Sequence, residues 1–171
     1  MASQLRVDHI TPVDGAPTGG GGGIVQVVNT QTGAVATGTT LIPFDDTIPQ
    51  ITEGFEVMTR TITPKFTTSK LLINVVTHLS ADQNSLPVTA LFEGTTANAL
   101  ACSFSHQYGL EDYPKVHNFN HFMTAATTSQ LTFRVRIGMN QSGNVTFNGR
   151  EESRRYGGTL ASSITIMEIS A

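Results

Sequence analysis

The 171-residue chain has no tryptophan, one cysteine and few charged residues. Charged side chains make up 13% of the sequence, about half of the share of roughly 25% found in an average globular protein. A weakly charged surface is poorly soluble, so this composition predicts that much of the surface is buried against other subunits. The formal net charge of −3 is small and argues against nucleic acid as a partner.

Because Cys102 is the single cysteine, no intrachain disulfide is possible. The surrounding ALACSF pattern predicts a buried thiol on a strand. No apolar run approaches the roughly 20 residues that a membrane-spanning helix needs. The N-terminal sequence MASQLRVDHI also lacks the apolar centre of a signal peptide. We therefore expect synthesis in the cytoplasm without membrane insertion.

Helical periodicity is nearly absent, whereas alternation of apolar and polar residues runs through the whole sequence. Gly, Pro, Asn and Ser separate the alternating segments at regular intervals, which is typical of an antiparallel jelly-roll β-sandwich. A solenoid is disfavoured because no fixed repeat period is present. The expected strands are 24–30, 39–44, 55–63, 71–80, 87–93, 99–106, 117–125, 131–139, 144–148 and 162–170.

Five consecutive glycines at 19–23 separate a short N-terminal piece from the strand-rich region. Such a run is a flexible linker, so residues 1–23 are predicted to be a docking arm with its linker and 24–171 a β-sandwich head. A lone strand is not stable in water, so the arm should add to a sheet of its own trimer or of another protein. A disordered tail is the alternative. The residues expected to dock are Leu5, Val7, His9 and Ile10.

The strand LTFRVRIGM places Arg134 and Arg136 on the face opposite to Phe133 and Val135. Two neighbouring arginines are unusual in a chain with ten basic residues. They are either solvated charges or contacts to another subunit, where arginine is enriched.

The loop FNGREESRRYGG gathers a large share of the chain's charges. We expect it to be a recognition loop or an intersubunit charge clasp with an aromatic anchor, because long loops often carry function. A solvated hairpin loop is the alternative. Its candidate contact residues are Arg150, Glu151, Glu152, Arg154, Arg155 and Tyr156.

Two strands carry features that bear on assembly. The near-continuous apolar run at 71–76 predicts burial on both faces, the second face being covered by a neighbour in a trimer. In the last strand, Glu168 shares a face with Ile164 and Ile166. It is expected either to pair with an arginine such as Arg60 or to sit at a frayed strand end.

No pattern in the sequence supports catalysis, a cofactor or a metal. His117 and His121 in HNFNH lie four residues apart, or about 13 Å along a strand, which is too far for one zinc ion. The glycine run is not a phosphate cradle, because neither Lys-Ser/Thr nor a helix follows it. We therefore expect a protein that is not an enzyme.

The ordered set LRVDHITPVDG, GGGGIVQVV, ITPKFTTSKLLINV and SSITIMEIS resembles small β-rich virion proteins of tailed bacteriophages. The resemblance covers almost the whole chain. It implies a homotrimeric, non-enzymatic virion component with a jelly-roll head, either a capsid decoration (cement) protein or a short tail fibre. The implied partners are further copies of the chain, the major capsid protein or a tail protein, and, for a fibre, a host surface glycan. The implied location is the external surface of the virion head or tail.

Overall fold

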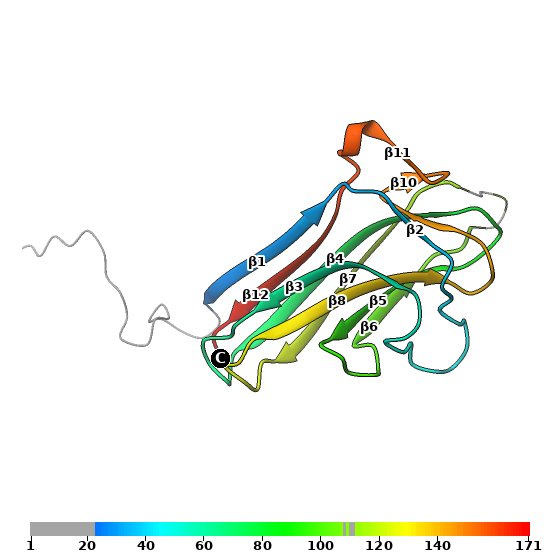
Figure 1. The fold of residues 1–171 in the computed structure, drawn as a ribbon. Coiled ribbons are helices and arrows are strands. Elements are labelled where there is room, and N and C mark those ends of the chain that lie inside the picture. Colours follow the sequence, from blue (N-terminus) through cyan, green and yellow to red (C-terminus); the bar gives the residue numbers. More distant parts are fainter. Residues whose placement is uncertain (1–22, 108, 110–111) are drawn as a thin grey trace, which may run out of the picture.

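The structure is a computed structural model that describes residues 23–107, 109 and 112–171. It confirms an all-β, antiparallel jelly-roll sandwich (Figure 1). The strands are β1 (Ile24–Thr32), β2 (Ala36–Gly38), β3 (Phe55–Ile62), β4 (Lys70–Ala81), β5 (Pro87–Glu93), β6 (Ala101–Phe104), β7 (Lys115–Thr124), β8 (Leu131–Met139), β9 (Val145–Phe147), β10 (Gly149–Arg150), β11 (Ser153–Arg154) and β12 (Ser162–Ile169), with a 3₁₀ turn at Tyr156–Gly158.

The strands form two layers whose order is that of a jelly roll. In the first sheet, β12 lies between β1 and β4, and β7 pairs with the other edge of β4. The short strands β9 and β2 extend this sheet beyond the end of β12. The second sheet has the order β3-β8-β5-β6. The long central strand β4 therefore organises the first sheet, and β8 and β5 form the centre of the second.

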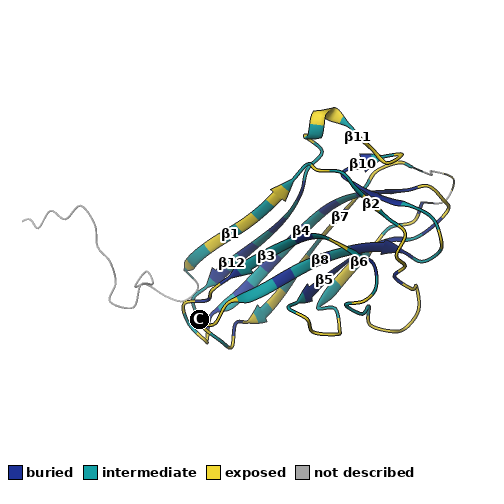
Figure 2. Ribbon diagram, in the orientation of Figure 1, coloured by how far each residue is buried: buried dark blue, intermediate teal, exposed yellow. Residues whose placement is uncertain are grey.

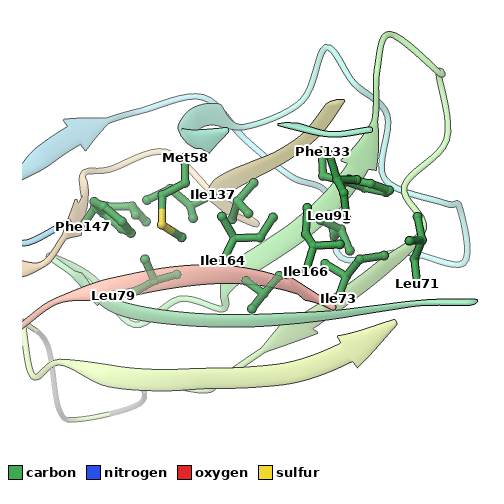
Figure 3. Close-up of a cluster of buried hydrophobic side chains, with 14 of the residues drawn as sticks. Met58, Leu71, Ile73, Leu79, Leu91, Phe133, Ile137, Phe147, Ile164 and Ile166 are labelled. Carbon is green, nitrogen blue, oxygen red and sulfur yellow. The ribbon is translucent and has the colours of Figure 1, made fainter. Parts of the chain in front are cut away.

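The main core fills the space between the two sheets. Isoleucine and leucine side chains of β4 and β12, including Ile73 and Ile166, face side chains of β3, β5 and β8, including Phe133 and Ile137 (Figure 3). Alternation produces this core directly, because every second residue of β4 and β12 is buried and the residues between are only half-buried. These strands thus present one apolar face to the other sheet.

A second, smaller core lies on the outer side of the second sheet. The segment 39–54 crosses this face, and its Ile42 packs with Val88, Ala90 and Phe92 of β5. As a result both faces of β5 are buried. We call the segment 39–54 the cover loop.

The structure corrects two of these expectations and leaves a third open. Residues 39–44, predicted as a strand, belong to the cover loop, whose backbone bonds from Ile42 N to Met139 O at 3.0 Å and from Gly54 N to Leu41 O at 2.8 Å form no ladder. Cys102, predicted to be buried, is exposed because it lies on the outer face of the edge strand β6. The outward-facing residues of the apolar run in β4, Leu72, Asn74 and Val76, are half-buried within this chain, so their cover by a neighbouring copy stays a prediction.

Candidate interaction surfaces

The outer face of the first sheet is nearly uncharged and carries a row of apolar side chains. The register places Val27, Met167, Leu72 and Phe122 side by side across β1, β12, β4 and β7. Val27 is 51% exposed and Phe122 is 58% exposed, so the two ends of the row are bare. Exposed apolar groups of this size, side by side, are typical of an interaction surface. We call this surface the open face.

A polar row adjoins the apolar one on the open face. Asn29, Thr165, Asn74 and Asn120 are cross-strand neighbours. Two of the links are side-chain hydrogen bonds of 2.8 Å, from Asn29 Nδ2 to Thr165 Oγ1 and from Asn74 Nδ2 to Asn120 Oδ1. Among the outward-facing residues of β1, β12, β4 and β7, Lys70 is the only one that is Asp, Glu, Lys or Arg. The open face therefore suits a flat, uncharged partner surface.

The two arginines of β8 lie on the outer face of the second sheet, as predicted, but their polar atoms are engaged within the chain. Arg134 forms an ion pair of 2.8 Å with Glu56 and donates from Nε to the carbonyl of Gly94 at 2.9 Å. Arg136 donates to the carbonyls of Glu53 and Gly54, each at 2.8 Å. These bonds hold one end of the cover loop and the turn after β5 against β8.

The ionised state of Glu56 fits this arrangement. Burial raises the pKa of Glu56, but hydrogen bonds from Thr59 and Arg134 outweigh it and leave the pKa below its usual value. The carboxylate is therefore charged at neutral pH and pairs with Arg134. Any contact of Arg134 or Arg136 to another subunit would add to these bonds within the chain.

The predicted charged loop is a hairpin that projects beyond the sandwich (Figure 1). Its two strands, β10 and β11, are joined through Glu151 and Glu152, both with positive φ angles, 50° and 58°. Glu151 pairs with Arg150 at 3.0 Å and with Arg155 at 3.2 Å. Glu151 thus forms its ion pairs within the hairpin, and a charge clasp to another subunit stays a prediction.

The aromatic residue of this hairpin does not anchor it within the chain. Tyr156 is 82% exposed, and its backbone has a φ of 49°. The short 3₁₀ turn that follows β11 is largely exposed (Figure 2). The aromatic contact is made instead by Tyr113, over whose ring the guanidinium of Arg150 lies 4.7 Å from the centroid. Tyr156 is therefore presented to solvent.

A buried polar chain links the two sheets near β5 and β7. His117, 2% exposed, has its Nδ1 2.9 Å from Thr89 Oγ1 and its Nε2 3.0 Å from Ser105 Oγ. Thr89 in turn lies 2.7 Å from Thr77 Oγ1. Burial lowers the pKa of His117 to about 4, so the imidazole is neutral at neutral pH. In this neutral state, one ring nitrogen donates to its hydroxyl partner and the other accepts.

Glu168 faces inward, as predicted, and is buried. Arg60 is not its partner: the carboxylate accepts hydrogen bonds from Gln26 Nε2 at 2.5 Å and from the backbone N–H of Lys65 at 2.7 Å. Burial raises the pKa of Glu168, but these hydrogen bonds outweigh it and leave the pKa below its usual value. The residue closes the turn before β4 onto the last strand, so the frayed-end alternative is also wrong.

The predicted docking residues Leu5, Val7, His9 and Ile10 lie outside the described residues. Within the described part of the chain, no group of three or more His, Cys, Asp or Glu side chains is placed to hold a metal ion. No helix among the described residues is long and apolar enough to cross a membrane.

Three of these features could not be read from the sequence. The apolar row of the open face depends on strand register, and the His117 chain depends on contacts between strands distant in sequence. The partners of Glu168 come from β1 and from the loop before β4. The only sequence signals were the bulky residues at alternate positions of β7 and the odd carboxylate in β12.

Comparison with known proteins bears on the fold and the family. The sequence profile of the Pgp3 C-terminal domain matches residues 26–171. No curated protein matches the chain.

Solved structures resemble the chain only remotely. The Eiger TNF of S. frugiperda is 11% identical with a TM-score of 0.47, and the match covers 83% of this chain and 92% of that one. The VP2 subviral particle of infectious bursal disease virus is 11% identical with a TM-score of 0.40, over 86% of this chain and 40% of that one. Dimeric latent PorU of Porphyromonas gingivalis is 11% identical with a TM-score of 0.41, over 91% of this chain and 14% of that one. Likenesses this remote say nothing about function.

Proposed function

The chain belongs to the Pgp3 C-terminal domain family, and from its open face we propose that it is a non-enzymatic structural protein that assembles as a homotrimer on a virion. The observation that carries the trimer is the apolar row Val27–Met167–Leu72–Phe122. A neighbouring copy packed there would remove its exposed ends from water, a gain of about 25 cal/mol for each Å² buried. The absence of carboxylates from this face spares the interface the cost of desolvating them.

The more specific role proposed is that of a capsid decoration, or cement, protein of a tailed bacteriophage. Support comes from the sequence resemblance to small virion proteins and from the jelly-roll head. In this role the arm residues Leu5, Val7, His9 and Ile10 dock on the capsid lattice. Three arms on one trimer multiply a modest affinity through effective concentration.

A short tail fibre is the second candidate. It is favoured by the projecting hairpin and by the nearly complete exposure of Tyr156, since receptor-binding surfaces commonly present aromatic side chains on loops. In a fibre, this hairpin would contact the host surface, for example a glycan, and the opposite end of the trimer would attach to the tail.

The trimer is tested by the mass of the full chain in solution, measured by sedimentation equilibrium. We expect three times the mass of the 18.3 kDa chain. Phe122→Asp places a charge in the apolar row and should shift the mass to that of one copy. Ile48→Asp, a matched control, places the same charge at a 52% exposed apolar residue of the cover loop and should leave the trimer intact. Monomeric wild-type protein, or a trimer that survives Phe122→Asp, would contradict the proposed interface.

The location is tested by immunogold labelling of purified particles, read by electron microscopy. Gold over the heads supports the cement role, and gold only at the tail supports the fibre. No gold on any particle would refute the virion role while leaving the result on the trimer unaffected.

A further inference from the structure

A groove lies on the outer side of the second sheet, between the cover loop and the edge strand β6. One hollow of about 410 Å³ is lined by residues 45–49 of the loop and 99–102 of the opposite segment. A smaller hollow of about 180 Å³ adjoins it and shares Asp45, Thr47, Pro49 and Cys102 with the first. The groove lies on the other sheet from the open face, so the proposed trimer interface does not use it.

Two aromatic rings line the smaller hollow. The ring centroids of Phe44 and Phe104 are 5.3 Å apart with an interplanar angle of 58°. They are 60% and 55% exposed although they contact each other, and Ile48, which lines the larger hollow, is 52% exposed. The groove therefore offers aromatic and aliphatic surface that the chain itself leaves uncovered.

Two carboxylates line the groove: Asp45 lines both hollows, including the one that holds the rings, and Asp46 lines the larger hollow. Asp45 accepts hydrogen bonds from the backbone N–H of Thr47 at 2.8 Å and from its hydroxyl at 2.5 Å, so its position is fixed. These two bonds lower the pKa of Asp45 and keep it ionised at neutral pH. No Lys or Arg among the described residues forms an ion pair with either carboxylate. The two negative charges are thus left without a cation.

We propose that this groove binds the side chain of an arginine presented by a partner protein. The guanidinium is the cation that both stacks on an aromatic face and donates directed, charge-assisted hydrogen bonds to carboxylate oxygens. Its three methylene groups would pack against the exposed rings of Phe44 and Phe104. A quaternary ammonium group could use the rings but not the hydrogen-bond acceptors of Asp45 and Asp46.

The thiol of Cys102 can report whether the groove is occupied. Cys102 is exposed, lines both hollows and is the single cysteine of the chain. The rate at which neutral N-ethylmaleimide alkylates this thiol in the full-length protein therefore measures occupancy of the groove. The probes are propylguanidinium, the neutral isostere propylurea and tetramethylammonium, compared at equal ionic strength.

We expect propylguanidinium to slow alkylation in a saturable manner, propylurea to have no effect, and tetramethylammonium to require a several-fold higher concentration. The double variant Asp45→Asn/Asp46→Asn should raise the half-protecting concentration of propylguanidinium about tenfold, since two exposed carboxylates are removed. Phe104→Leu, which keeps the apolar bulk but removes a ring, should raise it two- to fivefold. Glu152→Gln, a matched control on the distant hairpin, should leave it unchanged.

Three results would overturn the proposal. Absence of protection by propylguanidinium would mean that no cation site exists. Equal protection by tetramethylammonium would identify a site for quaternary ammonium headgroups instead. Equal protection of the wild type and of the Asp45→Asn/Asp46→Asn variant would show that the probe acts elsewhere. The alkylation rate without probe, together with circular dichroism, establishes that each variant is folded.

Discussion

The outer faces of the two sheets differ in how far the chain itself covers them. The second sheet is covered by its own chain: the cover loop buries Val88 and Phe92, and Arg134 and Arg136 tie loop backbone to β8. Among the described residues, no loop covers the outer face of the first sheet in this way, and Phe122 and Val116 are exposed on it. The outer face of the second sheet is therefore largely covered by its own chain, apart from the groove beside β6, whereas that of the first sheet is open. This asymmetry is the reason for placing the proposed trimer interface on the first sheet.

The largest expected effect compares two phenylalanines, one on each outer face. Phe92 is fully buried under the cover loop, so Phe92→Ala should lower the free energy of unfolding by about 3–5 kcal/mol. Phe122→Ala, at a 58% exposed position, should lower it by less than about 1 kcal/mol in protein diluted to the monomer. Urea unfolding measures both. Equal losses would mean that the two faces do not differ in the way described.

The next effect concerns His117, which links the two sheets. Its pKa is about 4 in the folded chain against an ordinary value of 6.5, so below pH 6.5 the unfolded chain binds the proton more readily. The free energy of unfolding is therefore not reduced by this group above pH 6.5. It falls by about 3 kcal/mol as the pH drops to 4, because the unfolded chain takes up the proton first.

Urea unfolding between pH 7 and pH 4.5 tests this slope, because the carboxylates titrate mainly below that range. The variant His117→Gln should be less stable at pH 7 but should lose little more on acidification. Burial lowers the pKa of His78 as well, so a small slope should remain. An undiminished slope in the variant would assign the acid sensitivity to another group.

A smaller effect is expected at Glu168, which joins β12 to the turn before β4. Glu168→Gln removes the charged acceptor of Gln26 Nε2 and of the Lys65 N–H and should cost about 1–3 kcal/mol. Arg60→Met is the matched control, because Arg60 is not its partner. Thermal unfolding at pH 7 compares the two variants. A greater loss of stability for Arg60→Met would support the predicted ion pair between Arg60 and Glu168.

The smallest effect is expected at the ion pair between Glu56 of β3 and Arg134 of β8. Glu56→Gln removes the partner of Arg134, but both side chains are about one-third exposed, so the loss should be about 0.2–1 kcal/mol. Addition of 1 M NaCl should shrink this difference, because salt screens exposed pairs. A loss above about 2 kcal/mol would contradict the description of this pair as an exposed, screened one.

Much of the fold could be predicted from local patterns. Alternation located β5 and β8 with their observed bounds, and it placed Arg134 and Arg136 opposite the core. It misassigned residues 39–44, because an apolar segment that lies across a sheet as a cover has the same composition as one that pairs within it. Local sequence also failed for Cys102, because exposure there depends on β6 being an edge strand.

The candidate surfaces were less accessible to sequence analysis. The charged hairpin was visible because its residues are contiguous, although its ion pairs turned out to be internal. The open face and the groove bring together residues from strands and loops far apart in the chain, so neither has a local signature. Whether the N-terminal arm docks as predicted lies outside the described residues.

The position of β12 has a consequence for how the protein folds. This strand follows every other described strand in the chain, yet it lies between β1 and β4, and Gln26 bonds to Glu168 across 142 residues. The first sheet therefore cannot close until its last strand has left the ribosome, and folding must wait for the end of this domain's synthesis. Until then β1 and β4 each expose a strand edge, so the nascent chain should depend on chaperones more than a helical protein of the same length.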